Sequence, residues 1–402
     1  MSNCDWLKAK CKRRDVIKAG GYGICVFCLA SVGGCALIRN EKIEKQDLLS
    51  EEPLPEVLEK GLIKTEISPW FEKMDDGALT CTLCPKSCKL NNGERGRCRV
   101  RKNIDGQGYS LVFGNPALVQ EDPVERKPFY HVFPGSRALS VSTAGCNLAC
   151  KFCEVWDMAL VDPEEVHSYD MPPQKVIEYA LAADLPAVSF AFGEPVVFYE
   201  YMQAVAQRAK SAGLLNLMHT AGYINPAPLK KILRLIDAVN FDLKGFDEEF
   251  YREYVGGELD IALQSLKTIG NTDTHLEITM IIIPTINDDP TVIRQMCRWI
   301  AAELGPETPL HFARFYPLYK LSGLPRTPVS ALETARNVAL EEGLKHVYIA
   351  KVTGHDGENT FCPQCSELLI SRTGFVIDEM TLDQGRCPSC ETVLGGLWTK
   401  AN

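Results

Sequence analysis

The sequence predicts an α/β protein with a partial (βα)6 barrel and a small cysteine-rich metal module at each end of that barrel. Between residues 137 and 351, strand-like and helix-like hydrophobic patterns alternate, which is typical of parallel sheets. The six repeats are too few for an eight-stranded barrel and fit an open one. Closely spaced cysteines stand before and after the repeats, and such spacing favours metal binding over disulfides.

The chain of 402 residues has room for one large domain and smaller ones. Its net charge of −9 argues against nucleic acid as a partner, because phosphate binding needs a basic face. We divide the chain into a twin-arginine-like signal or anchor segment at 1–40, a charged linker at 41–67, the N-terminal four-cysteine module and its lead-in at 68–136, the barrel core at 137–351, and a zinc-ribbon- or rubredoxin-like tail at 352–402.

The first forty residues predict a targeting or anchoring role. Arg13 and Arg14 resemble a twin-arginine signal, and the uncharged run 19–38 follows them. As a helix this run would rise roughly 30 Å, enough to cross a bilayer core. Membrane association or export is therefore expected from this segment, and a buried hairpin is the alternative.

The repeats of the core are read from hydrophobic periodicity. Strands are expected at residues 138–143, 187–192, 214–220, 238–244, 275–283 and 310–315, with an edge strand at 346–350. The clearest helical patterns cover residues 174–183, 198–212, 228–235, 291–304 and 331–342.

The first predicted strand leads into the pattern Cys146-x3-Cys150-x2-Cys153. The C-terminal ends of strands are where α/β barrels build their active sites. Iron–sulfur clusters usually take four cysteine ligands, so three thiolates would hold a [4Fe–4S] cluster and leave one iron open for a small molecule. Half of a zinc site, or a loop of unrelated thiols, is the alternative interpretation.

Three other predicted strands end in polar residues. Glu194 follows the second strand in Ala-Phe-Gly-Glu-Pro, where unpaired carbonyls and a carboxylate could bind an ammonium group. Asp242 and Lys244 end the fourth strand on one face, and His311 lies in the sixth. The alternative interpretations are a plain strand-end turn at Glu194, a surface ion pair between Asp242 and Lys244, and a hydrogen-bonded core histidine at His311.

Two further groups of four cysteines predict metal sites. In the tail, two Cys-Pro-x-Cys knuckles predict a tetrahedral site for zinc, with rubredoxin-type iron as the second choice; these ligands are Cys362, Cys365, Cys387 and Cys390. The N-terminal group is less regular and leaves zinc and an auxiliary iron–sulfur cluster equally open; its members are Cys81, Cys84, Cys88 and Cys98.

The loop that carries Cys146, Cys150 and Cys153, called the cluster loop below, has Phe152 before its third cysteine. It resembles the cluster-binding loop of radical S-adenosylmethionine (radical SAM) enzymes. The resemblance implies an open (βα)6 fold and S-adenosyl-L-methionine on the open iron. Reductive cleavage would then yield a 5′-deoxyadenosyl radical that abstracts hydrogen. It also implies that Glu194, Asp242, Lys244 and His311 contact this cosubstrate, and that the chemistry is cytoplasmic, in tension with the N-terminal segment.

A closer resemblance runs from about residue 68 to the end of the chain. The two four-cysteine groups, the segments 122–128, 130–135 and 241–246, and the cluster loop resemble in order the radical SAM enzyme of the AmmeMemoRadiSam system. That enzyme is related to pyruvate formate-lyase activating enzymes. The resemblance implies a flavodoxin- or ferredoxin-like electron donor and companion proteins of that system. It suggests a partner protein as the target, and an RNA or a metabolite stays open as an alternative.

The sequence departs from this family at several positions. Phe192 stands where a glycine is usual, and asparagines expected near the barrel mouth are replaced at Val155, Ala221 and Lys351. A membrane-linked iron–sulfur electron-transfer or carrier protein, and a zinc-ribbon binding module, are the alternative functions. Neither explains the Gly-Glu-Pro turn together with the barrel.

Overall fold

The computed structural model describes residues 57–398. The predicted signal or anchor segment lies outside the described residues. In the described range no helix has both the length and the hydropathy that a membrane span requires. The last part of the predicted linker contains two short strands. Val57–Lys60 (β1) pairs with His167–Tyr169 (β10), and Glu66–Ile67 (β2) pairs with Gln107–Ser110 (β7).

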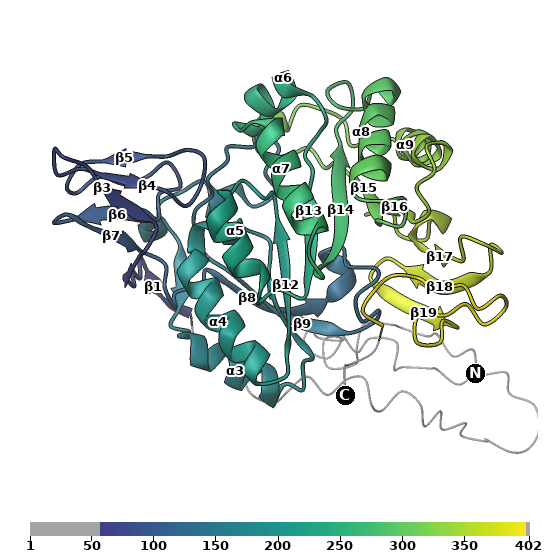
Figure 1. Ribbon diagram of the computed structural model, residues 1–402, viewed down its shortest axis with the longest axis horizontal. Coiled ribbons are helices and arrows are strands. Elements are labelled where there is room, and N and C mark those ends of the chain that lie inside the picture. Colours follow the sequence, from purple (N-terminus) through teal and green to yellow (C-terminus); the bar gives the residue numbers. More distant parts are fainter. Residues whose placement is uncertain (1–56, 399–402) are drawn as a thin grey trace, which may run out of the picture. The chain divides into compact units, whose positions relative to one another are not determined.

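The central sheet has eight strands in the order β16-β15-β14-β13-β12-β11-β9-β8 (Figure 1). Every pairing from β9 to β16 is parallel, whereas β8 pairs antiparallel with β9. The strands are β8 Leu118–Pro123, β9 Arg137–Ser142, β11 Ala187–Phe190, β12 Leu215–Thr220, β13 Ala238–Asp242, β14 His275–Ile282, β15 Leu310–Arg314 and β16 Val347–Ala350. The predicted α/β class with a mostly parallel sheet is thus confirmed, and β8 is an addition that the sequence did not predict.

Amphipathic helices cover the outside of the sheet (Figure 1). In α4 the buried residues Met202, Val205, Ala206 and Ala209 recur at helical spacing, which produces a stripe that packs on the strands. The longer helices are α3 Pro173–Ala182, α4 Tyr199–Ser211, α5 Pro226–Leu233, α7 Leu259–Gly270, α8 Pro290–Glu303 and α9 Val329–Glu341. The short ones are η1 Val124–Arg126, α2 Trp156–Ala159, η2 Pro163–Glu165, η3 Pro195–Phe198, α6 Glu248–Phe250, η4 Tyr251–Val255, η5 Tyr319–Leu321 and η6 Asp356–Glu358.

The N-terminal end of the barrel is filled by the chain that precedes it. Ala138, Ala187 and Ala238 lie at the beginnings of three of the strands and are buried in one cluster with Phe129 and Val132. Alanine side chains leave room there for the larger residues of the lead-in segment. This end of the barrel is therefore packed, as barrel interiors generally are.

The N-terminal module consists of two small antiparallel sheets, β2-β7-β6 and β3-β4-β5. Its strands, besides those named above, are β3 Phe71–Lys73, β4 Leu79–Cys81, β5 Lys89–Leu90 and β6 Arg101–Ile104. Arg101 is buried and forms a two-pronged ion pair with Glu200 of α4, with both N–O distances 2.9 Å. Asn225 fixes the module from the barrel side, since its Nδ2 donates to the carbonyl of Thr82 at 2.7 Å.

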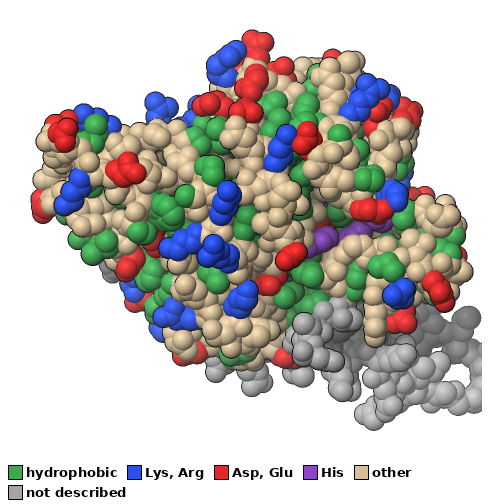
Figure 2. Space-filling model, viewed as in Figure 1, with side chains coloured by type: hydrophobic (Ala, Val, Ile, Leu, Met, Phe, Trp, Pro, Cys, Tyr) green, Lys and Arg blue, Asp and Glu red, His purple; other side chains and the backbone are tan. Residues whose placement is uncertain are grey.

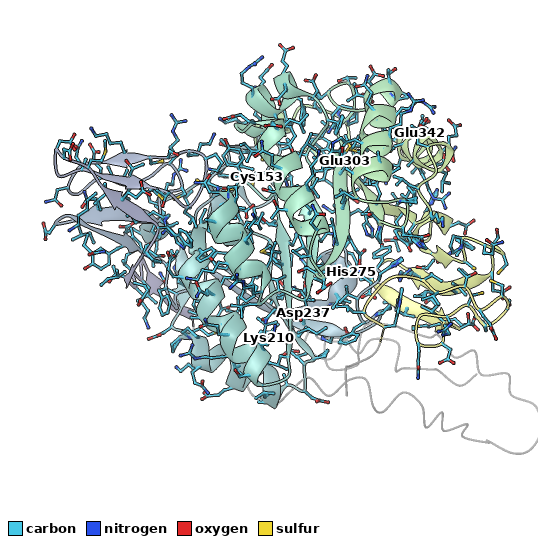
Figure 3. The ribbon with its side chains drawn as sticks, in the orientation of Figure 1. Cys153, Lys210, Asp237, His275, Glu303 and Glu342 are labelled. Atoms are coloured by element: carbon cyan, nitrogen blue, oxygen red, sulfur yellow. The ribbon has the colours of Figure 1, made fainter. Side chains whose placement is uncertain are left out.

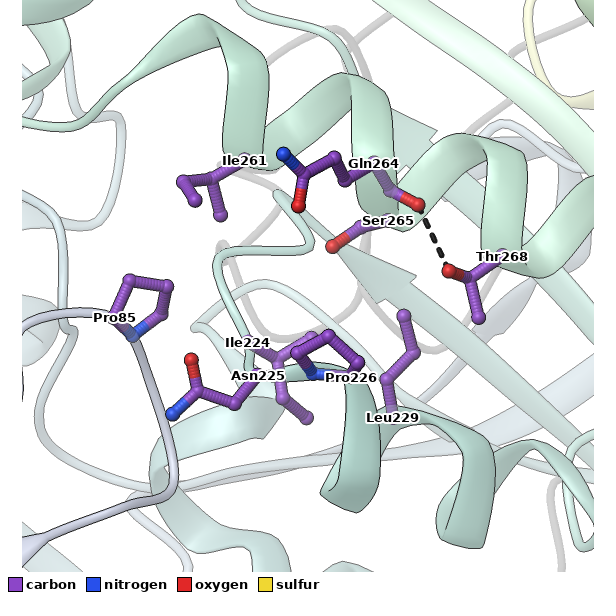
Figure 4. A pocket seen from close by; sticks show the side chains of 9 residues that line it. All are labelled: Pro85, Ile224, Asn225, Pro226, Leu229, Ile261, Gln264, Ser265 and Thr268. Atoms are coloured by element: carbon purple, nitrogen blue, oxygen red, sulfur yellow. Dashed lines mark hydrogen bonds between the residues drawn. The ribbon is translucent and has the colours of Figure 1, made fainter.

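A cavity of about 30 Å³ beside Asn225 marks this joint (Figure 4). Pro85 of the module and Ser265 of α7 both line it. A cavity of this size holds about one water molecule, so it is a packing gap and not a ligand site.

The tail forms a three-stranded antiparallel sheet of β17 Thr360–Phe361, β18 Leu368–Thr373 and β19 Val376–Met380. Histidines lie where it meets the barrel (Figure 2), among them His275, which Figure 3 labels. His131 is buried there, with Nδ1 2.7 Å from the carbonyl oxygen of Gly395 and its ring against Trp398. The tail is thus packed directly against the barrel.

Candidate active site

One cavity of about 670 Å³ lies at the C-terminal ends of the barrel strands. Cys146, Cys150 and Cys153 all line it, and Figure 3 labels Cys153. Glu194, Asp242 and Lys244, which the sequence singled out, line the same cavity. The structure therefore brings together six of the seven residues predicted for the cluster and the cosubstrate.

Backbone hydrogen bonds connect the cluster loop to η4. Ala149 N donates to the carbonyl of Val255 at 2.9 Å, and Lys151 N donates to that of Tyr254 at 2.8 Å. Burial raises the pKa of Cys150 to about 12, so the free thiol is neutral at physiological pH. Three half-buried thiols that line one cavity fit a cluster that takes three protein ligands and leaves one iron for a small molecule. Binding of iron would deprotonate these thiols.

Glu194 is the N-cap residue of η3 and is buried at 6% exposure. Its Oε1 accepts from Thr220 Oγ1 at 2.5 Å and from Val196 N at 3.2 Å, and its Oε2 accepts from Ala221 N at 2.9 Å. A carboxylate can accept about four hydrogen bonds. The protein therefore fixes the orientation of Glu194 and leaves one acceptor site for a ligand such as an ammonium group.

The preceding turn also differs from the usual form of the motif. Phe192 has φ +71°, in the left-handed region that glycine normally occupies. Its ring lines the cavity, and the guanidinium of Arg126 lies 5.0 Å from the ring centroid. The aromatic side chain thus takes space in the cavity that a glycine would leave empty. Its left-handed backbone conformation costs roughly 1 kcal/mol or more in strain.

Asp242 and Lys244 form an ion pair inside the cavity, not on the surface. His219 also contacts Asp242, with Nε2 to Oδ1 3.1 Å. Burial by itself would raise the pKa of Asp242, but Lys244 and His219 lower it below its usual value. Burial opposes the charge of Lys244, whereas the Asp242 carboxylate raises its pKa above the usual value, so both groups are charged beside the cluster loop.

The prediction for His311 needs correction. Its side chain is fully buried, with Nε2 2.7 Å from Glu277 Oε2, and it is not among the described residues that line the cavity. Ala313, two residues further along β15, does line it. His311 and Ala313 point to the same face of the strand but lie about 6.6 Å apart along it. The rings of Tyr130 and His311 pack together with their centroids 4.7 Å apart. His311 is a hydrogen-bonded core histidine, the alternative considered from the sequence.

The thiols of the tail form a compact cage. All four sulfur atoms lie within 4.8 Å of one another, and the Sγ–Sγ distances are 3.5 Å for Cys362 to Cys390 and 3.6 Å for Cys365 to Cys387. A tetrahedral zinc site with Zn–S bonds of about 2.3 Å would have edges of about 3.8 Å. The cage therefore fits a single metal ion.

The N-terminal cysteines lie directly behind the cluster loop. Cys81 and Cys98 are buried, and the carbonyl oxygen of Cys98 lies against Gly145, the residue before Cys146. Burial raises the pKa of Cys98 to about 12. This four-cysteine group and the cluster loop thus share one packed interface.

Sequence reasoning missed several residues that line the cavity. His219 could have been found, since it lies one residue before the end of a predicted strand. Glu125 and Tyr130 of the lead-in and Phe375 of the tail also line the cavity. No periodic pattern places them there, because they reach the site from outside the strand–helix repeats.

Comparisons with known proteins agree with this geometry. Residues 140–295 match the family model described as the radical SAM superfamily. An uncharacterized protein of Methanocaldococcus jannaschii is 39% identical over 323 residues, which are 80% of this chain and 96% of that protein. The pyruvate formate-lyase-activating enzyme of Clostridium pasteurianum is 26% identical over 229 residues, 53% of this chain and 92% of that enzyme. The pyruvate formate-lyase 1-activating enzyme of Escherichia coli K12 is 20% identical over 232 residues, 54% of this chain and 93% of that enzyme.

Proposed function

This chain belongs to the radical SAM superfamily, and on that premise we propose that it binds a [4Fe–4S] cluster, cleaves S-adenosylmethionine reductively and abstracts hydrogen from a substrate. It is a radical SAM enzyme. The observation that carries the finer proposal is the convergence of the three loop cysteines, Glu194 and the Asp242–Lys244 pair on one cavity.

Each residue has a role that its environment supports. Cys146, Cys150 and Cys153 hold the cluster, which when bound supplies the electron that splits the sulfonium to give the 5′-deoxyadenosyl radical. Glu194 offers its remaining acceptor site to the ammonium of the methionine moiety. Lys244 offers its ammonium to the methionine carboxylate, and Asp242 keeps that ammonium charged and in place.

The substrate class rests on the relatives. Relatives of named function include activating enzymes, and the ordered motifs resemble the AmmeMemoRadiSam branch. We therefore assign hydrogen abstraction from a partner protein of that system, with a flavodoxin- or ferredoxin-like protein as electron donor.

The remaining assignments concern the metals and the N-terminus. The tail cage holds zinc, with rubredoxin-type iron as the second choice, and Cys81, Cys84, Cys88 and Cys98 hold zinc or an auxiliary cluster. The segment 1–40 directs membrane association or export, while the chemistry itself is cytoplasmic. Fusing this segment to a reporter and fractionating cells tests that role, since a reporter left in the cytosol would contradict it.

Product analysis tests the proposed chemistry. Anaerobically reconstituted enzyme should form 5′-deoxyadenosine from S-adenosylmethionine and dithionite. Cys150→Ala should form none, and Cys297→Ala, which alters a buried cysteine in α8 away from the cavity, should match the wild type. A protein that takes up iron and sulfide but forms no 5′-deoxyadenosine would support the electron-transfer alternative instead.

A further inference from the structure

The cavity has two sides of different origin. The proposed cluster and cosubstrate residues follow strands β9, β11 and β13. The facing wall includes Ile281 of β14, Ala313 of β15 and Ala350 of β16, and it continues into Phe375 of the tail. A residue of the C-terminal four-cysteine module thus forms part of the active-site cavity.

Phe375 is held at the tip of the hairpin between β18 and β19. The connection has two residues, Gly374 and Phe375, and a glycine in the first place is typical of such tight turns. Gly374 has φ +65°, and its N–H donates to Glu358 Oε2 at 3.1 Å. Because Glu358 follows β16, this hydrogen bond ties the hairpin tip to the barrel edge.

Strand β18 also supports Tyr130, a second residue of the cavity wall. Arg372 of β18 is 3% exposed, and its Nη2 donates to the carbonyl of Tyr130 at 2.9 Å. Its guanidinium carbon lies 4.4 Å from the centroid of the Tyr130 ring, and that tyrosine lines the cavity. Buried charge-assisted hydrogen bonds of this kind fix geometry strongly. The tail therefore holds Tyr130 and contributes Phe375.

The metal cage is part of what keeps this strand in place. The buried core of the tail contains six residues, two of which are the cage ligands Cys362 and Cys387. A core this small is insufficient for an independent fold, so metal binding supplies folding free energy. Strand β18 begins three residues after the ligand Cys365 and ends at the hairpin tip.

We propose, on the basis of the function proposed above, that the C-terminal module completes the substrate side of the cavity. Phe375 acts as a specificity-determining residue that limits which hydrogen donors reach the radical. The metal in the four-cysteine cage keeps Phe375 and Tyr130 in position, and so links metal occupancy to the shape of the active site.

Access is tested with Phe375→Ala in the full-length enzyme. The probe is perdeuterated 2-propanol, and the measurement is the deuterium-labelled fraction of the 5′-deoxyadenosine formed with dithionite. We expect this fraction to rise at least twofold. The matched control Phe361→Ala alters another exposed phenylalanine of the tail that does not line the cavity and should leave it unchanged. An unchanged fraction in Phe375→Ala would overturn the role of this residue.

The link to the metal is tested without turnover. Cys365→Ser should lose the tail metal by elemental analysis and should increase amide hydrogen exchange at residues 130–133 at least tenfold. Exchange in β12 should stay the same, and Glu379→Ser, an exposed change on β19, should change neither quantity. Unaltered exchange at 130–133 after metal loss would refute the link.

The two tests separate this inference from the proposed function. If the wild-type enzyme forms no 5′-deoxyadenosine, the proposed chemistry fails, while hydrogen exchange still decides whether the tail metal holds the wall. If 5′-deoxyadenosine forms but neither variant has its expected effect, only the inference about the tail fails.

Discussion

The carbonyl oxygen of Cys98 lies 2.6 Å from the position that a Cβ atom on Gly145 would occupy. Gly145 precedes the first cluster cysteine and has φ +97°. The N-terminal module can therefore approach the cluster loop this closely only because the loop residue has no side chain.

Gly145→Ala should impair both stability and cluster binding. The new methyl group would collide with the Cys98 carbonyl and with Val100, and overpacking of this kind costs about 1–3 kcal/mol. We expect a lower midpoint of chemical denaturation and less iron per chain after reconstitution. The matched control is Gly77→Ala, since Gly77 has φ +80° but nothing within 4 Å of its Cβ position. Equal losses in both variants would mean that backbone strain, and not the contact, is responsible.

Asp242→Asn should weaken S-adenosylmethionine binding and also destabilise the fold. Loss of one partner from a buried ion pair costs about 3–5 kcal/mol, because the ammonium of Lys244 is left unpaired beside the cluster loop. We expect the Kd measured by calorimetry to rise at least tenfold, which corresponds to about 1.4 kcal/mol.

The double variant Asp242→Asn with Lys244→Met separates the two effects. Without the unpaired ammonium it should recover much of the stability of the wild type, yet it should still bind S-adenosylmethionine weakly. Recovery of tight binding in the double variant would show that the pair has only a structural role.

Glu125 should make stability depend on pH near neutrality. Burial raises the pKa of this carboxyl to about 7 from its usual value of 4.5. Above pH 4.5 the folded state therefore binds a proton that the unfolded state has lost, so stability should fall as the pH rises from 4.5 to about 7. The full change is on the order of 3 kcal/mol. Urea denaturation at several pH values should show this decline in the wild type and not in Glu125→Gln; equal pH profiles would contradict it.

Metal analysis should give about four irons per chain for the cluster and one zinc for the tail cage, and a second zinc or additional iron for the N-terminal group. Cys390→Ser should remove one zinc and leave the iron content unchanged, whereas Cys88→Ser identifies the metal of the N-terminal group. If that variant loses iron and not zinc, the N-terminal group holds an auxiliary cluster. Loss of iron in Cys390→Ser would instead favour a rubredoxin-type site in the tail.

The alternation of strands and helices was enough to predict the parallel core. Each expected strand is present, including the edge strand β16. Helix α7 was not singled out, although Ala262, Leu266 and Ile269 recur at helical spacing. The antiparallel strand β8 could not be predicted, because its place beside β9 depends on pairing and not on its own hydrophobic pattern.

The site residues that lie at or just after the ends of predicted strands could be predicted from the sequence. Residues next to a strand end, such as Glu194 and Asp242, reach the cavity. His311 shows the limit, because alternation gives the face of a side chain but not its depth in the barrel. Phe375 shows another, since its contact with the cavity depends on how the tail packs against the barrel.

The small alanines at the beginnings of the strands have a consequence for the order of events in turnover. Phe129 and Val132 are completely buried over them and close the base of the barrel, which leaves the cavity open at the C-terminal ends of the strands. Under the proposed chemistry, methionine and 5′-deoxyadenosine would leave by that same end. If the target is a partner protein, its docking would cover this route, so the two fragments would leave after the partner does.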